Sequence, residues 1–183
     1  LRVFLGRQQA IVSSSDPSPK GFAALAERAV AMARVVPEDS NAGLPEIADG
    51  LLDASGLGLD DLVEPDAASL IARAAAAEDA ALAVRGVTNS EGADAGWGRT
   101  VIALAASNGF TGQYVRTSHS ISATALAGSG TAMERDYDYH ATVHLADLDA
   151  ADAIGRIAGE RAVARLHPTR PKTAKLPVVY SPR

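Results

Sequence analysis

The 183-residue sequence contains no cysteine, and that absence removes several classes of protein from consideration. Without thiols, the chain has no disulfide scaffold, no cysteine nucleophile and no cysteine-ligated metal site. Proteins of any compartment can lack cysteine, but the lack of disulfides favours the cytosol. We therefore expect a cytoplasmic protein.

Long apolar runs and clusters of basic residues are also lacking. No stretch reaches the roughly 18 apolar residues that a membrane crossing needs, and no signal peptide opens the chain. Asp and Glu number 22 against 17 Lys and Arg, for a net charge of −5, whereas a nucleic-acid surface needs clustered cations. We therefore expect neither a membrane nor a nucleic-acid partner. Basic residues gather only in a tail that we interpret as a solvated connector: Arg165, His167, Arg170, Lys172 and Lys175.

Aromatic residues are few, with one Trp, four Tyr and three Phe, although hydrophobic residues reach 47%. A chain of this length can bury a sizeable core, and here alanine and small aliphatic residues must supply most of it. The pattern of residues 1–6 predicts a strand with no initiator Met before it, and residues 177–180 predict another strand at the far end. We therefore expect a fragment of a longer protein.

The first part of the chain predicts a hairpin followed by a helix. Short β-type runs at residues 2–5 and 10–13 flank a turn, and Asp16 or Ser18 is placed to cap a helix that begins near Pro19 and ends at Pro37. The apolar residues of this helix keep a three-to-four spacing, which predicts one buried face. That predicted face consists of Phe22, Leu25, Ala29, Met32, Ala33 and Val36.

Two more helices are predicted beyond a long irregular connection. Residues 37–66 are rich in Pro, Gly, Asp and Asn and predict a loop with a short helical turn around residues 44–52. Asp66 is placed to cap a helix over residues 67–84, and Asp149 to cap another over residues 150–166. The residues expected to face inward are Leu70, Ile71, Ala74, Ala77, Ala81 and Val84 in the first, and Ile154, Ile157, Ala158, Ala162 and Leu166 in the second.

The middle of the chain predicts antiparallel strands over residues 87–91, 99–107, 112–127 and 133–148, with turns at the glycine-rich stretches 92–98 and 128–130. The fold class is therefore α+β, with a mainly antiparallel sheet and about three packed helices. Residues 114–124 carry polar side chains through most of their length. A strand this polar exposes one face to water or to a ligand-sized groove.

Three histidines and their neighbours are the candidates for chemistry. His140 and His144 are spaced as a metal pair would be, but a zinc protease also needs a glutamate base and a third ligand, so we favour two histidines on a half-exposed strand face. His119 lies between Ser118 and Ser120, whose side chains point to the other face of a strand, and no nucleophile elbow is present. We favour a polar strand face there as well. The sequence does not assign a role to any of the three histidines.

A charged stripe follows at residues 134–139. Strand alternation places Glu134, Asp136 and Asp138 on one face and the residues between them, Arg135, Tyr137 and Tyr139, on the other. Such carboxylates can do acid–base work or bind a hard cation. We favour a structural role, either as a solvated face or in pairs with Arg on a neighbouring strand.

Several segments together resemble the TldD/PmbA family, on the PmbA side, and they occur in the family's order. Residues 87–93 resemble its "TN(S/T)EG" segment, and residues 133–139 resemble its "MERDY" segment. The others are Ser14-Ser15-Asp16-x-Ser18-Pro19, Gly109-Phe110-x-Gly112-x-Tyr114 and residues 161–168. The resemblance extends from about Val3 to Tyr180. Histidines at positions 140 and 144 are not expected as a rule in the family, which argues against a family-wide role for them.

The resemblance implies a TldD/PmbA N-terminal-type domain over residues 1–170 with its front segment missing, and the start of a following domain or connecting strand over residues 171–183. In that family a TldD-type subunit carries zinc in a His-Glu-x-x-x-His motif and pairs with a PmbA (TldE) subunit that lacks it. The pair processes peptides, including microcin precursors. The zinc ligands belong to the C-terminal half, so the resemblance implies no catalytic, cofactor or metal residue in this fragment, with zinc in the partner subunit or in the missing half.

The expected function is therefore that of a non-catalytic subunit, which dimerises with a TldD-type subunit or with itself and helps to bind a peptide substrate. Two alternatives stay open: a zinc metallopeptidase whose metal site lies in the missing half, and a regulator associated with gyrase or DNA. A sheet with a polar face suits a peptide ligand. The candidate peptide-facing or interface residues are Tyr114, Arg116, Ser118, Ser120 and Ser122.

Overall fold

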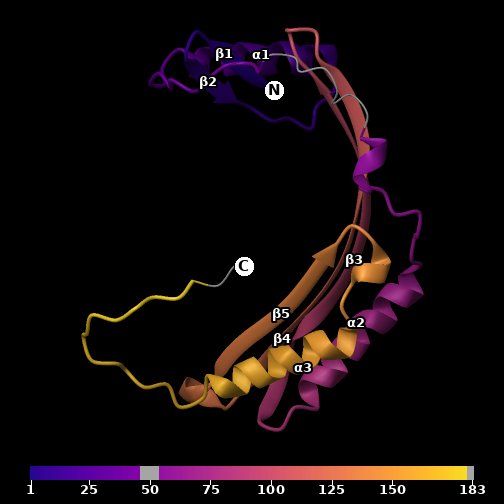
Figure 1. Ribbon diagram of the computed structural model, residues 1–183, viewed down its shortest axis with the longest axis vertical. Helices are drawn as coiled ribbons and strands as arrows, with labels where there is room; N and C mark the ends of the chain where they lie inside the picture. The colour runs from indigo at the N-terminus through magenta and orange to yellow at the C-terminus, as the bar shows by residue number, and fades with distance from the viewer. Residues whose placement is uncertain (46–53, 181–183) are drawn as a thin grey trace. The chain divides into compact units, whose positions relative to one another are not determined.

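The computed structural model describes residues 1–45 and 54–180, which fall into two compact units (Figure 1). Unit 1 consists of residues 1–51 with the turn 105–110, and unit 2 of residues 52–104 and 111–183. Within the described ranges there are three α-helices and two antiparallel sheets, so the predicted α+β class is confirmed. Most of the helical turn predicted around residues 44–52 lies outside the described residues.

Unit 1 is built on a hairpin. Strand β1 (Arg2–Leu5) pairs antiparallel with β2 (Gln8–Ile11), and Gly6 makes the turn with a φ of 60°, a conformation that glycine adopts without strain. The predicted hairpin is confirmed, with the second strand beginning two residues earlier than expected. The hairpin turn is fixed to the chain that follows α1, because Arg7 Nη1 donates to the carbonyl oxygen of Ser40 over 2.8 Å.

Helix α1 (Pro19–Ala33) begins where the sequence predicts. Ser18 is the cap, since its hydroxyl accepts a hydrogen bond from the Gly21 N–H over 3.0 Å, while Asp16 instead accepts from the Ser18 N–H over 2.9 Å. A Cβ on Gly21 would lie 2.4 Å from Asp16 Oδ2, so the Asp16 side chain would have to move. Asp16 therefore holds the residue that caps the helix, and only Ser18 accepts a hydrogen bond from a free N–H group of the first helical turn.

The predicted buried face of α1 is only partly covered. Ala29 and Ala33 are fully buried, but Phe22 is 56% and Met32 44% exposed. A two-stranded sheet offers too little surface to cover a helix of four turns. The prediction that Phe22 and Met32 face a core is therefore wrong for this unit.

Unit 2 is built on a three-stranded sheet in the order β3 (Val87–Ala105), β4 (Thr111–Ala127) and β5 (Glu134–Thr142). Strand β3 runs through the glycine-rich stretch 92–98, so the turn predicted there is wrong. The glycines are accommodated within the strand. Gly92 takes a φ of 111°, and Gly96 allows a close approach of β4, since a Cβ there would lie 2.9 Å from Ser120 Oγ. Strand β5 ends six residues before its predicted limit, where residues 145–147 form a 3-10 turn.

Helices α2 (Ala67–Leu82) and α3 (Ala151–Ala164) pack together on one face of this sheet (Figure 1). Their approach is close because α3 presents glycines to α2, and a Cβ on Gly155 would lie 1.9 Å from the carbonyl oxygen of Ala77. The buried core between helices and sheet consists mainly of alanine, as the composition indicates. It contains Ala77, Ala81, Ile121, Ala123, Ala125, Ala127, Ile154, Ala158 and Ala162.

Two details of these helices differ from the sequence prediction. Asp66 caps α2 as predicted, accepting from the Ser69 N–H over 2.8 Å, but Ile71 is 70% exposed instead of facing inward. The cap of α3 is Ala150, without a side-chain hydrogen bond, because Asp149 lies against His140, with its N–H donating to His140 Nδ1 over 3.1 Å. In the part of the chain that the structure describes, every helix falls short of the length and apolarity that a bilayer crossing requires.

Candidate functional site

The sheet of unit 2 has two unlike faces, and strand β4 alternates between them. Thr117, His119 and Ile121 are buried on one side, whereas Arg116 and Ser118 are exposed on the opposite side, which we call the open face. The predicted polar, exposed strand face is confirmed. The residues predicted to contact a peptide or partner share this open face, with the last two of them half-buried: Tyr114, Arg116, Ser118, Ser120 and Ser122.

Aromatic side chains border the hydroxyl groups of the open face. Tyr137 and Tyr139 of β5 are about half exposed, at 52% and 47%, and their rings stack with centroids 6.1 Å apart and an interplanar angle of 25°. Ser122 is the register partner of Tyr139, so the stacked pair adjoins the line of serines. Strand alternation placed both tyrosines on one face, but the sequence did not single them out as part of the site.

The middle of the open face is flat. Ala141 is the register partner of Ser120, and Gly96 adjoins Ser120 from the other side, where no Cβ could fit without a shift. Farther along, Arg135 Nη1 lies 2.8 Å from Glu91 Oε2. The open face therefore has small side chains at its centre, with tyrosines and a charged pair towards one end, so another main chain could approach it closely.

The three candidate histidines occupy different environments. His119 lies on the helix-covered face and is fully buried, so its predicted place on a polar strand face is wrong. Strand alternation moves it to the face opposite Ser118 and Ser120, as the sequence argument for those serines required. Its Nε2 atom is 3.2 Å from Asp61 Oδ2, a neighbour distant in sequence that nothing in the local pattern signalled.

His140 and His144 do not share a strand face, because β5 ends at Thr142. His140 Nδ1 lies 3.2 Å from Asp149 Oδ2, and His144 Nε2 lies 2.7 Å from the carbonyl oxygen of Gly58. No group of three or more His, Asp or Glu among residues 1–45 and 54–180 is arranged to hold a metal ion. These described residues therefore do not fit a zinc site.

The carboxylates of the charged stripe bind α3. Glu134, Asp136 and Asp138 share one face as predicted, and Asp136 and Asp138 pair with arginines of a helix. Arg161 Nη1 lies 2.7 Å from Asp138 Oδ1, and Arg165 Nε donates to Asp136. Burial alone would raise the pKa of Asp136, but the hydrogen bonds from Arg165 and the Tyr137 N–H hold that pKa below its ordinary value. These carboxylates are structural ties.

Comparison with known proteins matches residues 60–166 to the family described as the PmbA/TldA metallopeptidase central domain. The chain is 31% identical over 182 residues to the Metalloprotease PmbA of Escherichia coli O157:H7, a match that covers 99% of this chain and 40% of that protein. It is 28% identical over 181 residues to the Metalloprotease PmbA homolog of Haemophilus influenzae, covering 98% of this chain and 40% of the homolog. The chain thus spans about 40% of the length of these curated relatives.

Two solved structures resemble most of this chain. A modulator of DNA gyrase from Bacteroides thetaiotaomicron has a TM-score of 0.69 at 22% identity, covering 93% of this chain and 40% of that one. TldE from Thermococcus kodakarensis has a TM-score of 0.51 at 19% identity, covering 90% and 36%. At these identities the likeness shows a shared fold alone. The family match over residues 60–166, more than half of the chain, shows that the chain belongs to the PmbA/TldD family of metallopeptidase-related proteins.

Proposed function

We propose that this chain is the N-terminal part of a PmbA/TldE-type, non-catalytic subunit, which pairs with a TldD-type partner in the cytoplasm to process peptides. The observation that carries the proposal is the open face of unit 2 in a chain of this family. One face of the sheet is closed by two helices, while the other keeps small polar side chains exposed. The proposal assigns the open face to the peptide or to the partner subunit.

An extended peptide suits this surface for physical reasons. Its main chain carries a donor and an acceptor at each residue, and hydroxyl groups such as those of Ser118, Ser120 and Ser122 can serve as either. The flat centre around Gly96 and Ser120 lets a main chain come close. The exposed tyrosine rings at one end offer apolar area to a side chain of the peptide.

The described residues supply binding and orientation in this proposal, and no bond-breaking step is assigned to them. A metal ion bound elsewhere would supply the activated water or the Lewis acid that peptide hydrolysis needs. In keeping with this division, Asp136 and Asp138 contact Arg165 and Arg161. His119 and His140 lie against Asp61 and Asp149.

Zinc content and peptidase activity of the full-length protein, measured alone and mixed with a TldD-type subunit, test this proposal. We expect no stoichiometric zinc in the full-length protein alone, and activity only in the mixture. Stoichiometric zinc together with activity in the protein alone would contradict the non-catalytic assignment.

That contrary result would favour the second candidate, a metallopeptidase whose metal ligands lie outside these residues. The name of the Escherichia coli relative, a metalloprotease, favours it. The name of the Bacteroides structure suggests a third role, in modulating DNA gyrase. Salt-sensitive DNA binding by the purified chain would support that role, which the net charge of −5 disfavours.

A further inference from the structure

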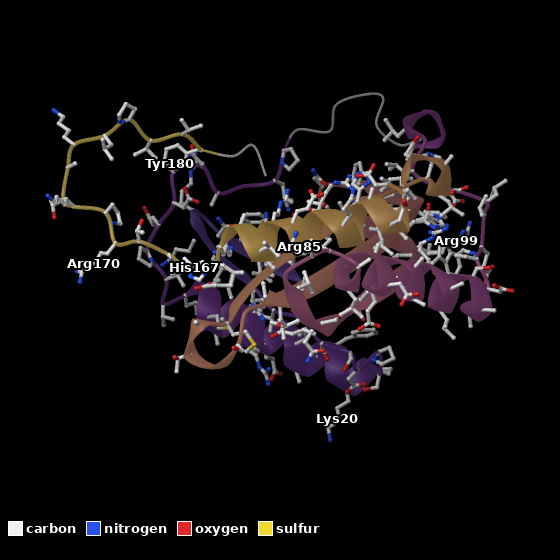
Figure 2. The ribbon with its side chains drawn as sticks, turned by 90° about the horizontal axis from the view of Figure 1, so that it is seen from below. Lys20, Arg85, Arg99, His167, Arg170 and Tyr180 are labelled. Carbon is white, nitrogen blue, oxygen red and sulfur yellow. The ribbon has the colours of Figure 1, made fainter. Side chains whose placement is uncertain are left out.

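Residues 58–63 contact the sheet at one end, and we call this segment the strap. Asp60 accepts hydrogen bonds from Nε and Nη2 of Arg99 on β3, over 3.0 and 2.8 Å; Arg99 is labelled in Figure 2. On β4, the Thr117 N–H donates to the carbonyl oxygen of Leu59 over 2.9 Å. Thr117 Oγ1 accepts from the Asp61 N–H over 2.8 Å. The strap is thus fixed to two strands by polar contacts.

The strap is also fixed to the chain that follows β5. Asp61 Oδ2 accepts from the Leu145 N–H over 2.7 Å, and His144 Nε2 lies at hydrogen-bond distance from the Gly58 carbonyl oxygen. None of the strap residues is buried, and Leu62 is 88% exposed. Because it buries little apolar area, the strap is held mainly by these polar contacts, and such segments open locally at a lower free energy than a packed core.

His119 makes an unusual contact with the strap, through Asp61. The ring is fully buried, and its Nε2 is 3.2 Å from Asp61 Oδ2, which is ion-pair distance. Yet neither ring nitrogen has a hydrogen-bond partner among the described residues. A neutral imidazole therefore gains little from this site, whereas an imidazolium would face a carboxylate at short range.

Asp61 is suited to that task because it stays ionised. The N–H groups of Leu145 and Val63 lower the pKa of its carboxyl, and the charges of His119 and His144 lower it further, against the opposing effect of burial. Asp61 therefore remains a carboxylate across the range in which imidazoles titrate.

Several other charged groups of unit 2 have partners of their own. On β3, Arg99 pairs with Asp60, and on the β5 side the register partner of His119 is the uncharged Thr142. Beyond it, His140 pairs with Asp149 at the start of α3, and His144 contacts Gly58. Of the α2 side chains, Arg73 has a buried Nη1 atom. Asp61 is the carboxylate that lies at ion-pair distance from the His119 ring.

We propose that His119 and Asp61 form a protonation-dependent latch, which holds the strap on the sheet more firmly when the imidazole carries a proton. With Asp61 ionised throughout, the gain of a proton creates a charge pair and its loss removes that pair.

Amide hydrogen exchange by NMR on the whole chain tests the latch, with the ring titration of His119 followed in the same samples. The reporters are the N–H groups of Asp61, Thr117 and Leu145, which the strap contacts protect. After correction for intrinsic exchange rates, their protection should fall roughly tenfold when the His119 ring loses its proton in the same samples. Protection that stays constant across that loss would overturn the proposal.

Two variants separate the latch from other pH effects. Asp61→Asn keeps a hydrogen-bonding side chain on the strap but removes its charge, so the three N–H groups should be less protected and show no step with pH. A step of unchanged size in Asp61→Asn would refute the latch. His140→Gln is the matched control, because it alters the half-exposed His140–Asp149 pair, and it should leave the step intact. Disappearance of the step in His140→Gln would also count against the latch, since the wrong histidine would then control it.

Discussion

The two units show how differently similar apolar patterns can end up. In unit 2, two helices cover a three-stranded sheet, and small side chains let them approach so closely that Ala77, Ala158 and Ala162 are fully buried. In unit 1, one helix lies against a two-stranded hairpin, and its largest apolar residue, Phe22, is more than half exposed. The spacing of apolar residues thus predicts which side of a helix turns inward, while the area of the opposing sheet decides how much is buried.

The largest expected effect comes from the closest contact in unit 2. Gly155→Ala would place a methyl group 1.9 Å from the Ala77 carbonyl oxygen, so α2 and α3 would have to separate. We expect the free energy of unfolding to fall by about 3 kcal/mol or more, measured by urea denaturation. Gly43→Ala in unit 1 is the control, because nothing lies within 4 Å of its Cβ position. Equal effects in both variants would show that the two units do not differ in this way.

A pair of truncations compares the two cores directly. Ile121 is 1% exposed in unit 2, so Ile121→Ala should lower the free energy of unfolding by about 2–4 kcal/mol, because the cavity adds to the lost transfer free energy. Phe22→Ala should cost much less, under about 1.5 kcal/mol, because the ring is already largely in water. Thermal and urea denaturation of both variants measure this difference. If Phe22→Ala cost as much as Ile121→Ala, the contrast between the units would be wrong.

Acid should weaken unit 2 through its paired carboxylates. Hydrogen bonds from Arg99 lower the pKa of Asp60, and main-chain N–H groups lower that of Asp61. A carboxyl with a lowered folded-state pKa stabilises the protein above its unfolded pKa of about 3.9. That contribution is lost as pH falls through the lower folded value. The urea concentration at the unfolding midpoint should therefore decrease as the pH drops below about 4. This decrease should be less steep in Asp60→Asn than in the parent chain. Parallel slopes would exclude this pairing as the cause.

The smallest effect is expected on the exposed side of α3. Arg156 and Glu160 form an i,i+4 ion pair at 2.8 Å, with both side chains more than half exposed. Glu160→Gln should change the free energy of unfolding by less than about 0.5 kcal/mol, since water and salt screen such pairs. Urea denaturation at low and high salt checks this estimate. A decrease in the free energy of unfolding above about 1 kcal/mol would mean that this pair contributes more than a solvent-screened ion pair does.

The sequence predicted what local patterns determine. Cap residues such as Ser18 and Asp66, and the alternation that separates Ser118 and Ser120 from His119, follow from rules that act over a few residues. Properties that depend on distant segments did not follow. Asp61 is distant from His119 in the sequence but lies beside it in the fold. A Cβ on Gly96 of β3 would lie too close to Ser120 on the neighbouring strand.

The open face was predicted from the same alternation, and its serines and Arg116 were named as facing a peptide or a partner, but its shape was not predicted. Its flat centre arises from residues on three strands, Gly96, Ser120 and Ala141, whose meeting depends on register. The stacking of Tyr137 on Tyr139 depends on side-chain rotamers, which strand alternation does not determine. The central claim is that the open face binds the peptide or the partner subunit during peptide processing.

The most direct test is to fill the flat centre with Ser120→Trp in the full-length protein, and to measure peptide processing with a TldD-type partner. Ala164→Trp, at an exposed position on α3, is the control for a bulky surface residue. We expect Ser120→Trp to abolish most of the processing at an unchanged melting temperature, while Ala164→Trp retains it. Full processing by a folded Ser120→Trp variant would show that the open face is not where the peptide or the partner binds.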